Sequence, residues 1–84
     1  MYYVYVLKSK VDSNTYIGYS GDLKARLESH NKGENKSTKH RAPFEIIYYE
    51  AYRNETDARR REQELKNSNY QKEQLLKRIG KSLE

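Results

Sequence analysis

Two short runs of aromatic and β-branched residues near the N-terminus limit the possible folds most strongly. Residues 2–7 (Tyr-Tyr-Val-Tyr-Val-Leu) and residues 16–19 (Tyr-Ile-Gly-Tyr) have the composition of strands on a pleated, half-buried surface. Between them, residues 12–14 (Asp-Ser-Asn) form a cluster that favours a turn. We therefore expect residues 2–19 to form an antiparallel hairpin, in which Gly18 marks a bulge or a close backbone approach.

The hairpin is followed by the signals of a short amphipathic helix. Asp22 can cap its N-terminus with a side-chain oxygen. Leu23, Leu27 and His30 recur at i, i+4 and i+7, so they share one helix face. Gly33 is suited to a left-handed stop just after this segment. We expect this helix to pack on the sheet through the face that carries the two leucines.

The second half of the chain predicts one more strand and two more helices. Residues 44–52 form a third run typical of a strand. Asn54 can begin a helix that runs to about Asn67, and a break at residues 68–69 separates it from a last helix that ends near Gly80. The order β-β-α-β-α-α predicts a small three-stranded antiparallel sheet flanked by helices, a fold of the α/β (α+β) class.

Length and composition narrow the class of protein further. The 84 residues make one domain, residues 1–84. Cysteine is absent, which rules out disulfides and fits a reducing compartment, so we expect a cytoplasmic protein. No segment approaches the roughly 20 apolar residues of a membrane helix, and residues 1–10 lack a signal-peptide pattern. We expect no membrane partner and a monomer, with a homodimer as the alternative.

Positive charge is concentrated in one part of the chain. The net charge is +5, and residues 24–41 hold six basic and two acidic residues. A concentrated basic surface favours a polyanionic partner, whereas a solvated, solubilising surface explains the same charge equally well. The basic side chains that would contact phosphates along this stretch are Lys24, Lys32, Lys36, Lys39, His40 and Arg41.

Glu62 interrupts the apolar pattern of the helix after Asn54. It is four residues after Ala58 and three before Leu65, so it lies on the stripe that faces the core. A carboxylate there is costly unless it is paired or bound to a cation. Considered alone, Glu62 favours an ion pair with a basic neighbour, or a helix rotated enough to wet it. The candidate partners are Arg59, Arg60, Arg61 and Lys66.

Arg26 and His30 are a second exception to the apolar pattern. They are four residues apart and share a helix face that Leu23 and Leu27 flank. A cation and an imidazole at this place would suit a cleft, but the spacing alone favours a snorkelling arginine and a half-buried histidine. The nine tyrosines also have two interpretations, which are packing with a wet hydroxyl and stacking on nucleic-acid bases.

The order of these residues resembles the GIY-YIG nuclease superfamily. Residues 3–5 (Tyr-Val-Tyr) stand where the family has Gly-Ile-Tyr, and residues 16–18 (Tyr-Ile-Gly) match the second triplet in full. The likeness is greatest to small bacterial proteins that are almost nothing but this domain, and it covers residues 1 to about 80. It implies the fold described above and an endonuclease activity, either structure-directed or non-specific.

The predicted helices carry the rest of the resemblance. Arg26 matches the family's helix arginine, and His30 matches the His or Tyr found one helical turn later. Residues 58–66 resemble the family's closing helix, which places the metal ligand at Glu62. Glu64 is the competing carboxylate, but helical counting turns it toward solvent.

The resemblance implies hydrolysis of phosphodiester bonds in DNA, with RNA as the alternative substrate, by means of one divalent cation, Mg²⁺ or Mn²⁺. Glu62 would hold the cation, and Arg26 would place its guanidinium on the scissile phosphate. His30 would position or polarise the water–phosphate network, Tyr5 would activate the water, and Tyr16 would orient it or contact the phosphate. A free phenol has a pKa of about 10, so Tyr5 acts as a base only beside cations.

Two departures from the family pattern and one alternative function stay open. Tyr3 replaces the first glycine of the name-giving triplet. Tyr19 stands where some members carry a lysine near the active site, which puts any help from that lysine in doubt. The alternative is a nucleic-acid-binding module in DNA repair or recombination that does not cut, and a protein-interaction domain is a third reading. Metal-dependent turnover distinguishes the nuclease from the binding module.

Overall fold

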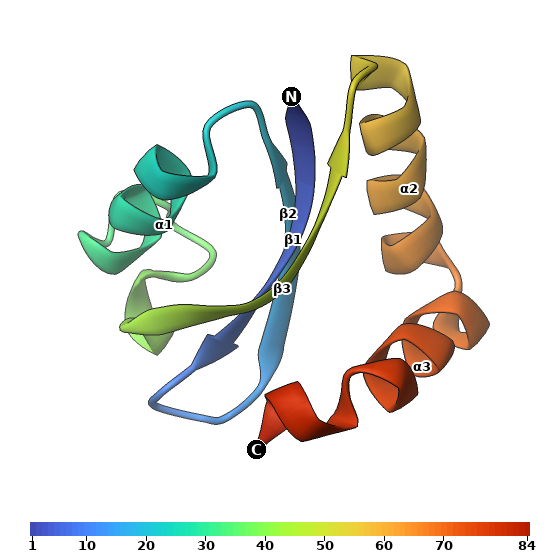
Figure 1. Ribbon diagram of the computed structural model, residues 1–84. Helices are drawn as coiled ribbons and strands as arrows, with labels where there is room; N and C mark the ends of the chain where they lie inside the picture. The colour runs from blue at the N-terminus through green and yellow to red at the C-terminus, as the bar shows by residue number, and fades with distance from the viewer.

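The computed structural model describes residues 1–84 and confirms the predicted order β-β-α-β-α-α (Figure 1). Its three strands are β1 (Tyr2–Ser9), β2 (Thr15–Ser20) and β3 (Phe44–Tyr52). Its three helices are α1 (Leu23–Asn31), α2 (Glu55–Asn67) and α3 (Asn69–Arg78). Two short 3₁₀ turns, η1 (Lys39–Arg41) and η2 (Gly80–Leu83), were not expected and follow α1 and α3. No helix has both the length and the apolar character that crossing a membrane requires.

The helix boundaries follow from the capping residues that the sequence offers. Asp22 accepts a hydrogen bond from the Ala25 backbone N–H at 3.0 Å, as its predicted role requires. Asn54 and Ser68 cap α2 and α3 in the same way. Gly33 has a φ of +75°, the left-handed conformation that ends α1 and that glycine adopts without a Cβ clash.

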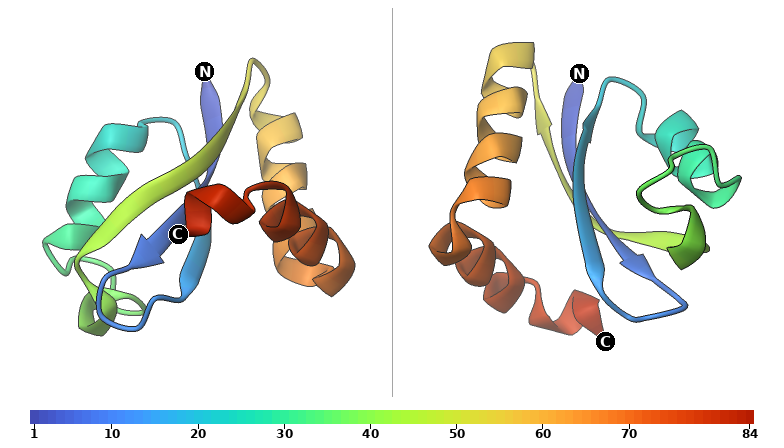
Figure 2. Two further views of the ribbon diagram at one scale, coloured as in Figure 1. Left: turned by 60° about the horizontal axis from the view of Figure 1, so that its bottom comes forward. Right: turned by 180° about the vertical axis from the view of Figure 1, so that it is seen from behind.

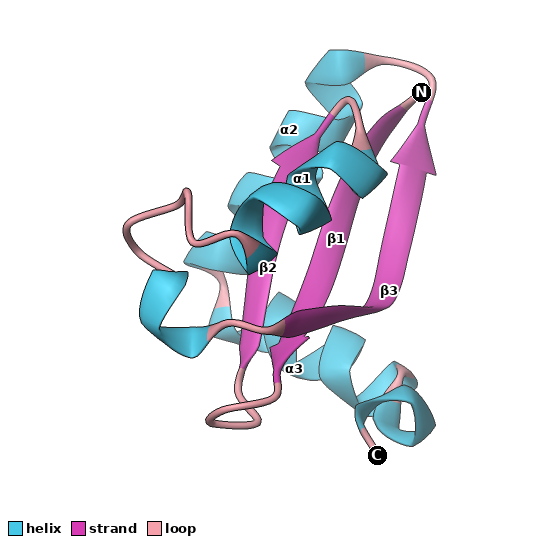
Figure 3. Cartoon of the chain, turned by 90° about the vertical axis from the view of Figure 1, so that its left-hand side faces the viewer, coloured by secondary structure: helices cyan, strands magenta, loops and turns pink.

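The sheet is antiparallel throughout, with β1 in the middle and β2 and β3 at its two edges (Figure 3). On β1, Tyr5 lies opposite Gly18 of β2 and Tyr49 of β3. The register is irregular between Val6 and Leu7, where β1 pairs with β3. The bulge that Gly18 suggested is therefore absent from β2, and the alternative of a close approach applies to this glycine.

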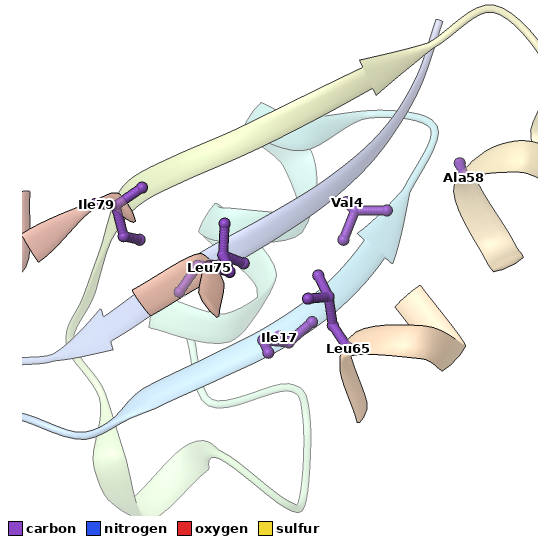
Figure 4. Packing of buried hydrophobic residues seen from close by; sticks show 7 residues of the cluster. Val4, Ile17, Ala58, Leu65, Leu75 and Ile79 are labelled. Carbon is purple, nitrogen blue, oxygen red and sulfur yellow. The ribbon is translucent and has the colours of Figure 1, made fainter. Parts of the chain in front are cut away.

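Both faces of the sheet are covered, which divides the core in two (Figures 1 and 2). Alternation along β1 directs Val4 and Val6 to the face that α2 and α3 cover, and Tyr5 and Leu7 to the face of α1. The larger cluster joins the sheet to α2 and α3, as the side chains in Figure 4 show. Its buried members are Val4, Val6, Ile17, Ala58, Leu65, Leu75 and Ile79. The smaller cluster holds Tyr5, Leu7 and Phe44 under α1.

A charged contact fastens α2 to β3. The Arg61 Nε atom donates to Glu50 Oε1 at 3.0 Å, and the Tyr48 and Tyr52 hydroxyls donate to the same carboxylate. Burial opposes ionisation of Glu50, but the hydrogen bonds from Arg61, Tyr52 and Tyr48 outweigh it and hold the pKa of Glu50 below its usual value of 4.5. Arg61 also binds Glu64 at 2.6 Å, and Glu64 is exposed as predicted.

The Glu50 contact should make folding stability sensitive to acid. Because its folded pKa lies below 4.5, the unfolded chain binds more protons than the folded chain below that pH, and stability falls there. Glu50→Gln should cost about 1–3 kcal/mol at neutral pH, because Arg61 and the two tyrosines lose a charged acceptor. The variant should also lose less free energy of unfolding than the wild type as the pH falls below about 4.5. Urea unfolding at a series of pH values measures this difference.

Glu64→Gln is the matched control, because it removes the exposed carboxylate that binds the same arginine. Its cost should stay below about 1 kcal/mol. Equal costs for the two variants would contradict the role assigned to Glu50.

Candidate active site

Tyr5 occupies the space that the missing side chain of Gly18 leaves on β2. A Cβ atom placed on Gly18 would lie 2.3 Å from the Tyr5 hydroxyl oxygen and 2.4 Å from its Cζ atom. Any larger residue at position 18 would displace the phenol ring, so glycine is required here by contact and not by backbone conformation. The sequence suggested a close backbone approach at Gly18. The structure shows a close approach there, but the Tyr5 side chain makes it and not a backbone.

A buried chain of hydrogen bonds begins at the Tyr5 hydroxyl. Its oxygen lies 3.0 Å from His30 Nε2, and His30 Nδ1 lies 2.8 Å from Thr38 Oγ1. The exposed fractions are 2% for Tyr5, 0% for His30 and 1% for Thr38. His30 is thus fully buried, more than the half-buried state that its spacing favoured. Three polar side chains from β1, α1 and the loop before η1 meet away from solvent.

Thr38, the last residue of this series of hydrogen bonds, indicates which nitrogen of His30 carries the proton. We assign the proton of His30 to Nδ1, because the Thr38 hydroxyl has the Asn35 carbonyl as an acceptor at 3.5 Å and its oxygen can then accept from Nδ1–H at 2.8 Å. The Nε2 atom is then left without a proton and accepts from the Tyr5 hydroxyl. Thr38 therefore assigns the roles in the pair, with tyrosine as donor and histidine as acceptor.

Burial sets the charge states of this pair. It lowers the pKa of His30 below 6.5, and the nearby Arg26 lowers it further. Burial also raises the pKa of Tyr5 well above its usual value of 10; the neighbouring Tyr16 and Glu62 add to the rise, and Arg26 opposes it. Arg26 thus acts in the direction that the sequence predicted, but burial outweighs it. At neutral pH the pair is a phenol and a neutral imidazole.

Tyr16 and Arg26 lie at the solvent side of this pair. Tyr16 is half-buried, and its ring meets the edge of the His30 ring with centroids 5.1 Å apart. Arg26 is exposed and makes no ion pair, although it lies close enough to lower the pKa of both Tyr5 and His30. Its guanidinium is therefore free to take a phosphate, as its predicted role requires.

Glu62 approaches the same place from α2. Ala58 and Leu65 are buried, which confirms the stripe, and the Glu62 side chain is only 15% exposed. One oxygen of Glu62 lies 3.2 Å from the Lys66 Nζ atom, one turn later. The sequence left two structural interpretations of Glu62, an ion pair with a basic neighbour or a rotated helix, and the structure shows the ion pair. Lys66 is 40% exposed, so solvent screens this contact from the lysine side.

The fit of a divalent cation depends on this single carboxylate. No group of three or more His, Cys, Asp or Glu side chains could enclose a metal ion. Mg²⁺ nevertheless suits such a site, since it keeps several waters and binds through one or two carboxylates together with substrate phosphates. A cation at Glu62 would thus be held mainly when a phosphate is also present.

Most of the basic residues predicted to contact phosphates are free to do so. Arg41 is the exception, because its Nε atom binds Asp12 Oδ2 at 2.7 Å and its guanidinium also faces the Phe44 ring. This hydrogen bond is the main reason that the pKa of Asp12 is lowered. The contact ties the hairpin turn to η1, so a phosphate would have to compete for Arg41. The residues that are exposed and make no ion pair are Lys24, Lys32, Lys36, Lys39 and His40.

Asn31 fixes the end of α1 that carries His30. Its side chain accepts from the Phe44 backbone N–H at 2.7 Å and donates to the Phe44 carbonyl at 3.2 Å.

Tyr19 stands where some family members carry a lysine. Its hydroxyl donates to Glu55 at 2.9 Å, and the Arg59 guanidinium lies over its ring, 4.5 Å from the centroid of that ring. Tyr19 is thus engaged with the start of α2.

Thr38 is the site residue that sequence reasoning missed. Its hydroxyl should be needed to keep His30 in one tautomer. Thr38→Val keeps the shape but removes the acceptor for Nδ1–H, so it should cost about 1–3 kcal/mol of stability. It should also give a mixture of tautomers in the ¹⁵N NMR spectrum of the imidazole.

Thr38→Ser is the matched control, because it keeps the hydroxyl and should keep one tautomer. A single, unchanged tautomer in Thr38→Val would show that Thr38 does not set the roles of the pair.

Comparison with known proteins places this geometry in a family. Residues 1–75 match the family model described as the GIY-YIG catalytic domain. UPF0213 proteins of Staphylococcus aureus strains Mu3 and Mu50 are 40% identical over 76 residues, which cover 89% of this chain and 92% of theirs. The solution NMR structure of the UPF0213 protein BH0048 from Bacillus halodurans is 38% identical, with a TM-score of 0.57, over 92% of this chain and 84% of that one. The chain therefore belongs to the GIY-YIG domain family.

Proposed function

We propose that this protein is an endonuclease that hydrolyses phosphodiester bonds in nucleic acid with one divalent cation. Family membership implies an endonuclease-type function, whereas the metal, the substrate and the residue roles are inferences from the site. The observation that carries the residue roles is the set of buried hydrogen bonds that joins Tyr5, His30 and Thr38 beside an unpaired Arg26, and the metal is inferred from the Glu62 carboxylate. The proposed substrate is DNA, with RNA as the alternative, and the proposed cation is Mg²⁺ or Mn²⁺.

The hydrogen-bonded pair supplies a way to activate water without a free phenolate. The Tyr5 hydroxyl takes a proton from the attacking water as it passes its own proton to His30 Nε2. Burial disfavours a separate phenolate, so the two transfers belong together. His30 becomes an imidazolium whose Nδ1–H still donates to Thr38. The hydroxide then attacks phosphorus, the bond to the leaving oxygen breaks, and that oxygen takes a proton from solvent while His30 returns its extra proton to solvent through Tyr5.

Arg26 and Glu62 act on the phosphate and not on the water. The Arg26 guanidinium neutralises charge that develops on the phosphoryl oxygens. The Glu62 carboxylate would hold the cation in place of its contact with Lys66. A bound Mg²⁺ or Mn²⁺ supplies further charge neutralisation at the phosphate and at the leaving oxygen. The half-buried Tyr16 orients the water or the phosphate through its hydroxyl.

Single substitutions should separate folding from cleavage. Glu62→Gln, Arg26→Ala and Tyr5→Phe should each fold and lose at least about 100-fold in cleavage rate, because each removes a group that acts in the transition state. The assay uses panels of branched, nicked and single-stranded DNA and RNA with Mg²⁺ or Mn²⁺. Chelation of the metal should stop cleavage.

Two exposed neighbours provide matched controls. Glu64→Gln, two residues from Glu62, and Arg60→Ala, on the same helix, should cut within about twofold of the wild type. Wild-type cleavage by Glu62→Gln would rule out the proposed role of that carboxylate.

Binding to nucleic acid should weaken steeply as salt rises, because the free lysines release counterions from the phosphates. Lys36→Ala or Lys39→Ala should each lower the slope of log Kd against log salt by about 1. Arg41→Ala should lower it by less, since Arg41 already binds Asp12. Fluorescence anisotropy across a salt series measures these slopes, and a Kd that does not change with salt would contradict the proposal.

A module that binds nucleic acid without cutting is the second candidate function. Two observations favour it, namely the burial of Tyr5 and the ion pair between Glu62 and Lys66. Binding with no metal-dependent turnover on any member of the substrate panel would establish this alternative.

A further inference from the structure

One flank of α2 carries a row of alternating charges beside β2. The members of this charged row recur at i, i+4, i+7 and i+11 and are Glu55, Arg59, Glu62 and Lys66. The Arg59 Nε atom lies 3.8 Å from Glu55 Oε1. The Lys66 Nζ atom lies 3.2 Å from Glu62 Oε2. The right-hand view of Figure 2 shows β2 with α2 on one side of it and α1 on the other.

Two tyrosines of β2 hold the two cations of the charged row in place. The Arg59 guanidinium lies over the Tyr19 ring, 4.5 Å from its centroid. The Lys66 Nζ atom lies 5.6 Å from the centroid of the Tyr16 ring. From Arg59 to Lys66 the helix rises about 10.5 Å, and from Tyr16 to Tyr19 the strand rises about 10 Å. The two cations are therefore held about 10 Å apart along β2, with Glu62 between them.

Both cations are open to a negatively charged ligand. The side chains of Arg59 and Lys66 are 61% and 40% exposed. The contact of Arg59 with Glu55 is longer than a hydrogen bond, and Glu55 already accepts from the Tyr19 hydroxyl. A pocket of about 250 Å³ between β2 and the α2–α3 junction opens Lys66 to solvent. A cation bound to Glu62 would also release Lys66 from its ion pair.

We infer that Arg59 and Lys66 bind the phosphates on either side of the phosphate that is cut. This inference rests on the proposed function, which puts the cut phosphate between Arg26 and Glu62. At a rise of about 3.4 Å per nucleotide, the distance of about 10 Å between the two cations is the length of about three nucleotides. That length holds the cut phosphate and one neighbour on each side. The nucleic-acid strand therefore follows α2 and the edge of β2 through the site.

Binding without metal tests these contacts separately from cleavage. Removal of a cation also frees its carboxylate, so each cation is removed in a protein whose carboxylate is already neutral. The probe is a fluorescent oligothymidylate of about twelve nucleotides. Glu62→Gln/Lys66→Ala should lower the slope of log Kd against log salt by about 0.7 relative to Glu62→Gln. Glu55→Gln/Arg59→Ala should lower it by about the same amount relative to Glu55→Gln.

An unchanged slope in either comparison would show that the cation serves only as the partner of its carboxylate, and would overturn the inference. Arg60→Ala is the matched control, because Arg60 is exposed and lies about 100° or more from the charged row by helical counting. Its slope should equal that of the wild type. An equal drop for Arg60→Ala would show that any exposed cation of α2 has this effect, and would also overturn the inference.

Strands with one uncharged methylphosphonate linkage locate the two contacts relative to the cut. In single-turnover cleavage by the wild type, a neutral linkage next to the cut on either side should slow the reaction about two- to fivefold. Arg59→Ala should be insensitive to the neutral linkage on one side, and Lys66→Ala to the one on the other side, because each variant has already lost that contact. Sensitivity of both variants to both neutral linkages would contradict the assignment of the flanking phosphates.

The two sets of measurements keep the charged row and the proposed function distinguishable. Lower slopes in both double variants of a protein that never cuts would support phosphate binding by the charged row and contradict the nuclease. Metal-dependent cleavage with unchanged slopes would support the nuclease and overturn the inference.

Discussion

The hydrogen bond between the Tyr5 hydroxyl and His30 Nε2 is the contact on which the rest of the site depends. It forms because Gly18 leaves room for the phenol ring beside β2 and because α1 places the edge of the His30 ring at the hydroxyl. Burial keeps both groups neutral, and Thr38 determines which of them donates. A pair arranged in this way can take a proton from water without first becoming charged.

The sheet explains how residues from both of its faces meet at one place. Tyr5 and His30 lie on the face of α1, whereas Glu62 belongs to α2 on the opposite face. They are linked around the free edge of β2, where Tyr16 meets the His30 ring on one side and Lys66, the partner of Glu62, on the other. The contact of Arg61 with Glu50 holds α2 on the sheet from the other edge, at β3. The ion pair that fastens α2 thus lies at the β3 edge, whereas the proposed chemistry lies toward the β2 edge.

The fold could be predicted from sequence because each element carries its own local signal. Alternating aromatic and β-branched residues mark the strands, and capping residues such as Asp22 and Asn54 mark the helix starts. The stripe through Ala58 and Leu65 also placed Glu62 correctly, since helical periodicity is a property of the sequence itself. The arrangement β-β-α-β-α-α follows from these signals and is confirmed.

The contacts between elements could not be predicted in this way. Thr38 lies in a polar loop without periodicity, and nothing in its neighbours indicates that it reaches His30. The ion pair of Arg41 with Asp12 joins segments 29 residues apart, so Arg41 looked like any other loop cation. The pocket beside Tyr16 depends on how the α2–α3 junction meets β2, which is a tertiary feature.

A single-turnover pH profile of DNA cleavage tests the proposed tyrosine–histidine proton path most directly. The pKa of His30 lies below 6.5, so the rate should fall only below that pH, where protonated His30 can no longer accept from Tyr5. Between about pH 7 and 9 the rate should stay nearly constant, because no phenolate has to form in advance. A rate that instead rises about tenfold per pH unit across that range would show that a deprotonated group must form first, and would contradict this path.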